Sequence, residues 1–140
     1  MSIMSEIFTV EGTTDGSSAT DDFLLYSDAF YTNAVSTTPL YIRIPAGTKL
    51  KIWSRRVNCP TQNTELVINY THDVTAAVPT WVEVNRDIQD VSVETSFDKE
   101  KRRPIVLRGF TGKEAVKFTW NQSAAAVAYF NAELEFAEDE

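Results

Sequence analysis

The residue types that support catalysis are sparse in this sequence. The chain has one cysteine, Cys59, and one histidine, His72, among its 140 residues. A single thiol and a single imidazole exclude a disulfide scaffold, a zinc finger and most nucleophile–base pairs. His72 precedes Asp73 at the end of an expected strand, where neighbouring side chains point to opposite faces. We therefore expect these two residues to form a solvated turn, and Cys59 to be a small buried side chain or an idle thiol.

Carboxylates are plentiful, but their spacing marks no site. A glycosidase needs two carboxylates with separated pKa values across a cleft, and no pair among the 20 acidic residues stands out. The first candidates for calcium ligands are Asp15, Ser17, Asp21 and Asp22. Their segment lacks the Asp-x-Asp-x-Asp-Gly pattern and its terminal Glu. The sequence predicts no enzyme activity, no metal and no cofactor.

Basic and aromatic residues instead gather where a protein contact could form. The first group is a face made of Arg43, Lys51, Trp53 and Arg55. Arg and Trp are enriched at interface hot spots. The alternative is that Trp53 lies flat over lysine stems on an exposed strand. Trp81 falls on the polar side of its expected strand and is a further candidate for the interface.

The second group is the charge run 99–103, which lies between two expected strands. Its bases Lys101, Arg102 and Arg103 are either solvated or paired with acids of a neighbouring subunit. Arginine would allow bidentate pairing with a carboxylate. The acids considered as partners are Asp21, Asp22 and the tail 138–140.

Net charge is −7, and it is distributed unevenly. Residues 1–42 hold six acids and no lysine or arginine, residues 43–113 hold twelve bases and eight acids, and residues 114–140 hold six acids and Lys117. Acidic ends around a basic middle would let the terminus of one copy lie against the middle of the next, or would serve an intramolecular arrangement. The overall acidity argues against nucleic acid as a partner, because phosphate contacts need a basic surface.

The first residues and the hydropathy of the chain bear on its location. No run of 18 consecutive apolar residues occurs, so no membrane span is expected. Residues 1–10 carry Glu6 and lack a basic leader with an apolar stretch. We therefore expect a protein that is not secreted.

The composition predicts an all-β fold in a single domain, 1–140. Val, Ile, Thr, Phe, Tyr and Trp, which suit a pleated sheet, make up 53 of the 140 residues. Period-two alternation and turn signals predict an antiparallel β-sandwich of about eight to ten strands, either jelly-roll or immunoglobulin-like. Residues 11–22 are expected to be a long flexible loop or arm, and 137–140 an acidic tail. The strands are expected at 3–10, 23–31, 39–45, 48–57, 64–72, 80–86, 88–97, 104–109, 114–121 and 126–136.

Alternation also predicts which side chains face inward. If 40–44 and 49–55 form a hairpin across Gly47, Ile44 lies opposite Leu50, and Arg43 lies opposite Lys51. Gly47 then suits a positive φ, and a carboxylate from elsewhere would relieve the two facing cations. The expected core comprises Leu40, Ile42, Ile44, Leu50, Ile52, Leu66, Ile68, Tyr70, Val82, Val84, Val91, Val93, Phe97, Val116, Phe118, Trp120, Ala128, Phe130, Ala132, Leu134 and Phe136.

Four stretches give the chain a resemblance to a known group of proteins. They are the start Met1-Ser2-Ile3-Met4, the Thr/Ser/Asp-rich segment 11–22, the turn Pro45-Ala46-Gly47-Thr48 and the final strand 126–136. With them the chain resembles small β-sandwich head decoration (cement) proteins of tailed bacteriophages and related viruses. The resemblance implies a non-enzymatic virion protein, made in the host cytoplasm, that forms a homo-oligomer, often a trimer. It also implies that the major capsid protein or another virion subunit is the partner.

Two other functions remain open at this level. One is a tail-tube or head-completion subunit, which would be a sandwich that polymerises into rings or tubes. The other is a carbohydrate-binding module, which would use Trp53, Trp81 and a tyrosine as a flat stacking platform.

Overall fold

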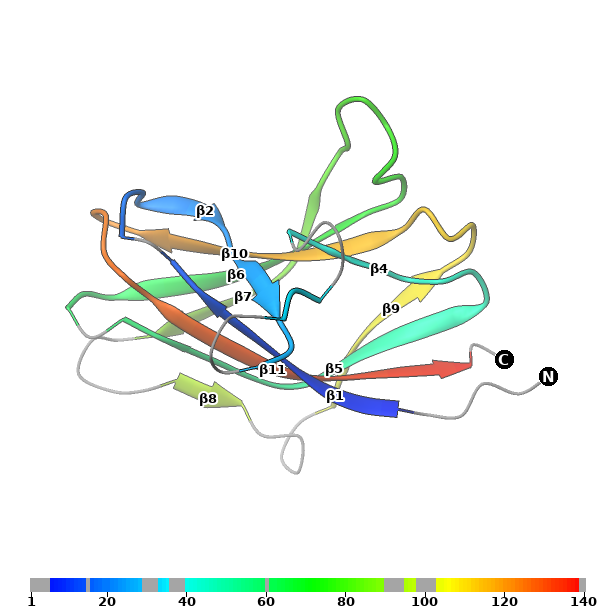
Figure 1. The fold of residues 1–140 in the computed structure, drawn as a ribbon, viewed down its shortest axis with the longest axis horizontal. Helices are drawn as coiled ribbons and strands as arrows, with labels where there is room; N and C mark the ends of the chain where they lie inside the picture. Colours follow the sequence, from blue (N-terminus) through cyan, green and yellow to red (C-terminus); the bar gives the residue numbers. More distant parts are fainter. Residues whose placement is uncertain are drawn as a thin grey trace.

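The chain forms two layers of antiparallel strands and no helix in the part that the computed structural model describes, residues 6–14, 16–28, 33–35, 40–59, 61–89, 95–97 and 103–138 (Figure 1). The all-β sandwich predicted from composition and alternation is confirmed. The eleven strands are β1 (Glu6–Thr13), β2 (Thr20–Asp22), β3 (Leu24–Tyr26), β4 (Ile42–Arg43), β5 (Thr48–Asn58), β6 (Thr64–Thr71), β7 (Val82–Gln89), β8 (Thr95–Phe97), β9 (Ile105–Gly109), β10 (Ala115–Gln122) and β11 (Tyr129–Glu138).

The strands divide into two sheets. Sheet A has six strands in the order β3-β1-β11-β5-β8, with β9 also paired to β5. Sheet B has five strands in the order β2-β10-β6-β7, with β4 also paired to β10. The two expected strands 80–86 and 88–97 correspond to β7 and the short β8, which belong to different sheets.

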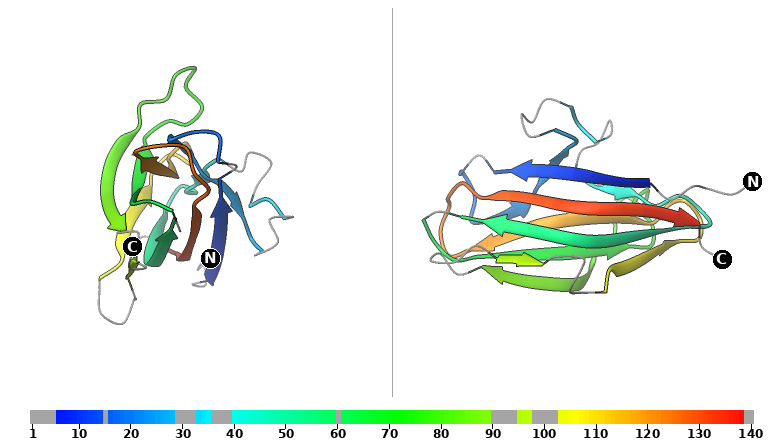
Figure 2. Two further views of the ribbon diagram at one scale, coloured as in Figure 1. Left: turned by 90° about the vertical axis from the view of Figure 1, so that its left-hand side faces the viewer. Right: turned by 90° about the horizontal axis from the view of Figure 1, so that it is seen from below.

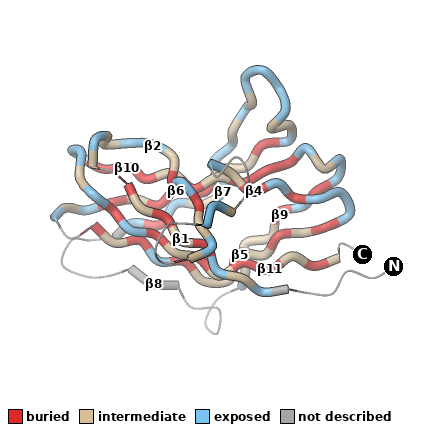
Figure 3. The backbone as a smooth tube through the Cα atoms, in the orientation of Figure 1, coloured by how far each residue is buried: buried red, intermediate tan, exposed pale blue. Residues whose placement is uncertain are grey.

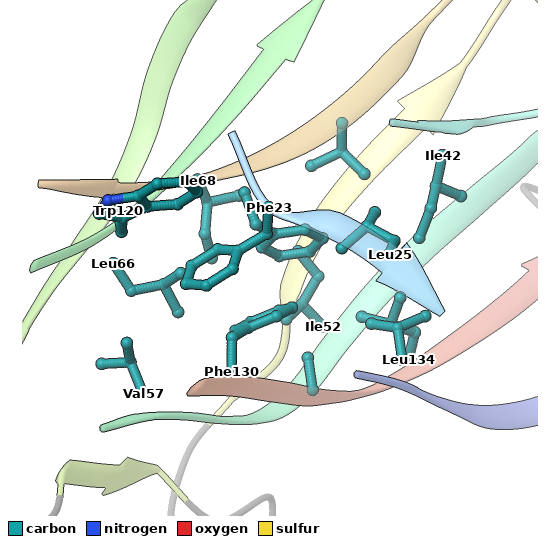
Figure 4. Packing of buried hydrophobic residues seen from close by; sticks show 14 of the residues in the cluster. Phe23, Leu25, Ile42, Ile52, Val57, Leu66, Ile68, Trp120, Phe130 and Leu134 are labelled. Atoms are coloured by element: carbon teal, nitrogen blue, oxygen red, sulfur yellow. The ribbon is translucent and has the colours of Figure 1, made fainter. Parts of the chain in front are cut away.

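Buried positions recur along the strands of both sheets (Figure 3). The core lies between the sheets and contains most of the side chains that alternation placed there. At its centre Phe130 of β11 packs against Phe118 of β10, with ring centroids 4.7 Å apart. Phe23 lies between the rings of Phe130 and Trp120, at centroid distances of 5.1 and 5.0 Å (Figure 4). Such aromatic pairs contribute about 0.5–1.5 kcal/mol each beyond the area that they bury. The cluster therefore joins β10 of sheet B to β11 of sheet A.

The expected hairpin of 40–44 with 49–55 is wrong. Strand β4 pairs with β10 in sheet B, whereas β5 pairs with β11 and β9 in sheet A. The turn 45–48 crosses between the layers, with Thr48 N donating to Pro45 O over 3.1 Å, and Gly47 has the expected positive φ of 74°. Alternation could not reveal this, because strands in opposite sheets turn their apolar faces to the same core. Arg43 and Lys51 are consequently not neighbours.

Three residues of the expected core are exposed instead. Leu40 is 40% exposed, and Val82 and Val84 of β7 are 53% and 39% exposed. The register of β7 against β6 shifts between Ile68 and Asn69, so Val84 has no residue opposite it. The bulge changes which side chains of β7 face inward. Val91 and Val93, and the side chain of Phe97, lie outside the described residues.

Residues 11–22 do not form one continuous loop. Residues 11–13 belong to β1 and 20–22 to β2. The connection between them is bound to the strands beside it: Trp120 Nε1 donates to Ser18 O over 3.2 Å, and Gln122 N donates to Ala19 O over 2.8 Å. At the other end of the chain, β11 continues through Glu138, so the first two residues of the expected acidic tail are strand, and 139–140 lie outside the described residues.

A buried carboxylate organises the turn between β9 and β10. Glu114 is 2% exposed. It accepts hydrogen bonds from Thr111 N at 3.0 Å, Thr111 Oγ1 at 3.1 Å and Gly112 N at 3.0 Å. Burial acts to raise the pKa of Glu114, but the hydrogen bonds from Thr111 and the neighbouring backbone outweigh it and hold the pKa below its usual value.

We predict that Glu114→Gln destabilises the fold in a pH-dependent way. A carboxyl whose folded-state pKa is lowered stabilises the protein above its unfolded pKa, and this contribution disappears as the pH falls through the folded value. At pH 7 the variant should lose about 1–2 kcal/mol of unfolding free energy, and the difference from wild type should shrink below about pH 4. Urea unfolding between pH 2.5 and 7 measures this, and a difference that does not depend on pH would contradict it.

Gly47 and Gly109 allow a second test, which compares backbone strain alone with a steric clash against the backbone. A Cβ on Gly109 would lie 2.5 Å from Ile44 O and closer still to Pro45 O, whereas a Cβ on Gly47 would have nothing within 4 Å. Gly47→Ala should therefore cost only the left-handed backbone strain, about 1–2 kcal/mol. Gly109→Ala must displace backbone and should cost more. Equal midpoints of thermal unfolding for the two variants would contradict this prediction.

Candidate interaction surfaces

The fold does not bring together the side chains that could act in catalysis or bind a metal. The imidazole of His72 packs edge-on against Tyr70, with centroids 5.1 Å apart. Asp73 Oδ1 accepts hydrogen bonds from the hydroxyl and the backbone N–H of Thr75, and the hydroxyl lowers the pKa of Asp73. Cys59 is completely buried. Within the described ranges no three His, Cys, Asp or Glu side chains form a group that could hold a metal ion.

The same part of the chain contains no helix with the length and apolar character needed to cross a membrane.

The basic face expected from Arg43, Lys51, Trp53 and Arg55 is dispersed over three environments. Arg43 lies on sheet B, where its Nε and Nη2 donate to Gly112 O over 3.1 and 2.7 Å. Lys51 and Trp53 lie on the outer face of sheet A. Arg55 is 6% exposed and points into the sandwich. The cause is a bulge between β5 and β11 at Trp53, after which the inward-facing positions of β5 change from even to odd.

Inside the sandwich Arg55 forms a bidentate ion pair with Asp87 of β7. The atom pairs Nε–Oδ2 and Nη2–Oδ1 are 2.5 and 3.2 Å apart, and both side chains are about nine-tenths buried. Asn85 Nδ2 donates to Asp87 Oδ1 over 3.0 Å. The pair joins sheet A to the edge strand of sheet B, so Arg55 has a structural role.

We predict that Arg55→Met lowers the unfolding free energy by about 3–5 kcal/mol, because it leaves the carboxylate of Asp87 buried without its cation. The double variant Arg55→Met with Asp87→Leu should recover most of this loss, because an apolar pair of similar volume carries no desolvation cost. Chemical denaturation of the wild type and of the two variants measures both differences. A double variant that is less stable than Arg55→Met would contradict this prediction.

On the outer face of sheet A, Trp53 forms a compact group with two charged residues. Its Nε1 donates to Glu135 Oε1 over 2.8 Å, and Lys51 Nζ lies 5.8 Å from the centroid of its ring. Glu135 is only 9% exposed although it is on the outer face. The strands β1, β11 and β5 lie side by side there, and no other strand of the described residues lies over them (Figure 2, right).

On the outer face of sheet B, two expected interface residues are engaged with Lys117. Its Nζ lies 3.3 Å from Asp22 Oδ2 and 4.5 Å from the centroid of the Trp81 ring. Thr119 Oγ1 also donates to Asp22 Oδ1 over 2.8 Å. Trp53 and Trp81 are thus on opposite sheets and do not form one stacking platform.

The remaining expected interface residues are at the surface or beyond the described ranges. Asp21 is exposed, and its Oδ1 accepts a hydrogen bond from Asp22 N over 2.8 Å. Arg103 is also exposed, just before β9. Lys101 and Arg102 lie outside the described residues. The contacts proposed for these four residues stay predictions.

Sequence reasoning missed a third surface, the edge of sheet B. Among the described strands β7 pairs only with β6, and it exposes apolar side chains at Val82, Val84 and Ile88, which are 53%, 39% and 63% exposed. Between them Arg86 forms ion pairs with Glu65 and Glu83. No pattern in the sequence revealed this edge, because alternation over 82–88 resembles that of a half-buried strand.

Comparisons with known proteins support the fold and no more. No protein-family model matches the sequence, and no curated protein is significantly similar to it. The structure is similar to that of murine APRIL, a jelly roll, with a TM-score of 0.57 and 10% identity over 96% of this chain and 99% of that one. This likeness favours the jelly-roll version of the predicted sandwich.

Two further solved structures align less well. One is the CBM22-1–GH10 part of the Clostridium thermocellum xylanase 10B, with a TM-score of 0.46 and 9% identity over 91% of this chain. The other is a structure of infectious bursal disease virus, Gx strain, with a TM-score of 0.47 and 14% identity over 99% of this chain. The chain spans 26% and 34% of the length of these two chains.

Proposed function

We propose that this protein is a non-enzymatic virion subunit that decorates the outer surface of a capsid, and that its β7 edge binds the major capsid protein. The proposal follows the resemblance to cement proteins, and it places the protein in the virion after synthesis in the host cytoplasm. The observation that carries it is the open edge of sheet B. The chain would act as a homo-oligomer that adds contacts across the shell.

An open sheet edge with apolar side chains suits a protein partner. Edge strands offer unpaired N–H and C=O groups, which are usually protected by lysine, proline or a covering element. Strand β7 has a bulge and one arginine, but the charge of Arg86 is compensated by Glu65 and Glu83. Addition of a strand from the shell protein beside Val82 and Val84 would pair with the outer backbone of β7 there and cover the exposed side chains of Val84 and Ile88. Backbone pairing would give affinity, and the exposed apolar side chains would add specificity.

The same edge could serve the tail-tube alternative, because an edge that pairs with another copy head to tail produces an open polymer. The sugar-binding alternative is weaker, since Trp53 and Trp81 lie on different sheets. Light scattering of the pure protein separates the first two functions: a small closed oligomer favours decoration, and an open-ended polymer favours the tube.

We predict that Val84→Lys with Ile88→Lys weakens binding to capsid shells that lack this protein by tenfold or more. Each lysine would introduce a charge that strand addition must desolvate. Phe110→Lys is the matched control, because Phe110 is 65% exposed outside β7 and should tolerate the same charge. Co-sedimentation with shells measures binding, and circular dichroism verifies the fold of each variant. Binding of the double variant with wild-type affinity would remove β7 from the proposal, and a wild-type chain that binds no shell would remove the function.

A further inference from the structure

Charge is segregated across the outer face of sheet A. Among the described side chains that point outward from β1 and β11, the charged ones are all acidic: Glu11, Glu133 and Glu135. The charged side chains that point outward from β5 and β9 are all basic: Lys49, Lys51, Arg56 and Arg108. The face therefore has an acidic half and a basic half, and the boundary between them runs along the strands between β11 and β5.

One row of side chains across the face is complementary to a copy of itself that is turned by 180°. Ile7 of β1 lies beside Glu135 of β11, Glu135 beside Lys51 of β5, and Lys51 beside Val106 of β9. The order is apolar, acidic, basic, apolar. A half-turn about the boundary between β11 and β5 would place Ile7 against Val106 and Glu135 against Lys51.

The burial of Glu135 is a reason why contact with a second copy would be favourable. Glu135 is nine-tenths buried, and its carboxylate accepts a hydrogen bond from Trp53 Nε1. It forms no ion pair within 4 Å in the described part of the chain, although Lys51 is its neighbour in the sheet. A buried carboxylate is costly without a cation. A lysine arriving from above the sheet would supply that cation.

We propose that two copies of this chain pack face to face through the outer faces of their A sheets, about a two-fold axis parallel to the strands. Lys51 of one copy then lies over Glu135 of the other, and the contact is made twice. A two-fold axis across the strands would instead place β11 over β11, acid over acid. Packed sheets with aligned strands are a common arrangement, at a separation of about 10 Å.

The size of the face suits a modest dimer. Strands β1, β11 and β5 lie side by side over about 27 Å, and the five-residue β9 over about 17 Å. At a spacing of about 4.8 Å these strands present roughly 470 Å² per copy. The pair would bury about 1,000 Å² or somewhat more, which is near the lower limit for a specific interface. Association is therefore expected at micromolar concentration. The inference does not depend on the proposed function, because it uses a surface other than β7 and needs no capsid.

Mixing two charge variants tests the contact directly. Lys51→Glu and Glu135→Lys each place like charges opposite each other across the two-fold axis, so each variant alone should be monomeric at a concentration where wild type is dimeric. Mixed in equal amounts they should form a heterodimer, because both intermolecular contacts become complementary. Native mass spectrometry, with one variant isotopically labelled, resolves the species. Lys113→Glu, an exposed change off this face, should leave the dimer intact.

The mixture separates an intermolecular effect from a folding defect. Both variants also place like charges side by side within one chain, and mixing cannot relieve that strain. Recovery of a heterodimer from two monomeric variants therefore supports the proposed interface. A wild-type chain that stays monomeric at 100 times the concentration expected for association, a wild-type trimer, or a mixture with no heterodimer would each overturn it. The double variant Lys51→Glu with Glu135→Lys should dimerise with itself, which tests the interface in a single chain.

Discussion

Burial of one face of each sheet against the other is the constraint on which the rest of the structure depends. Phe130 and Phe118 meet from opposite layers, and Phe23 and Trp120 extend the contact. Once those rings are buried, the pleat determines which side chains are left on the two outer faces. The segregated charges of sheet A and the Lys117 network of sheet B are consequences of that placement. The described strands offer two outward-facing sheets and the β7 edge for contact.

Much of this could be predicted from the sequence, because alternation is a local signal. It correctly assigned Leu50 and Ile52 of β5, Leu66 and Ile68 of β6, and every second residue from Ala128 to Leu134 to the core. It could not show which sheet a strand joins. A strand in sheet A and one in sheet B present the same pattern when both face one core, so β4 and β5 were expected to pair with each other.

The candidate interaction surfaces were harder to predict because each bulge reverses which alternate side chains of its strand face outward. The bulge at Trp53 turns Arg55 from the outer face to the interior, and the bulge at Val84 places Asp87 beside it. Neither bulge involves a glycine or proline that would mark it in the sequence. Lys51 and Trp53 were correctly placed on an outer face, but the carboxylate beside them, Glu135, belongs to a strand more than 80 positions away. Non-local pairing of this kind is outside the reach of a single sequence.

The bulge in β5 also limits how this chain can vary in length. Loss of one residue at the bulge, either Trp53 or Ser54, would restore simple alternation and leave Arg55 and Val57 facing inward. Loss of Lys51 would instead turn Ile52 towards solvent, or, if the bulge were kept, would reverse Arg55 and Val57 and leave the carboxylate of Asp87 without its cation. Insertions and deletions should accordingly be tolerated in the surface connection 72–81, and within β5 only the loss of a bulge residue should be tolerated, in any natural relative that keeps this architecture.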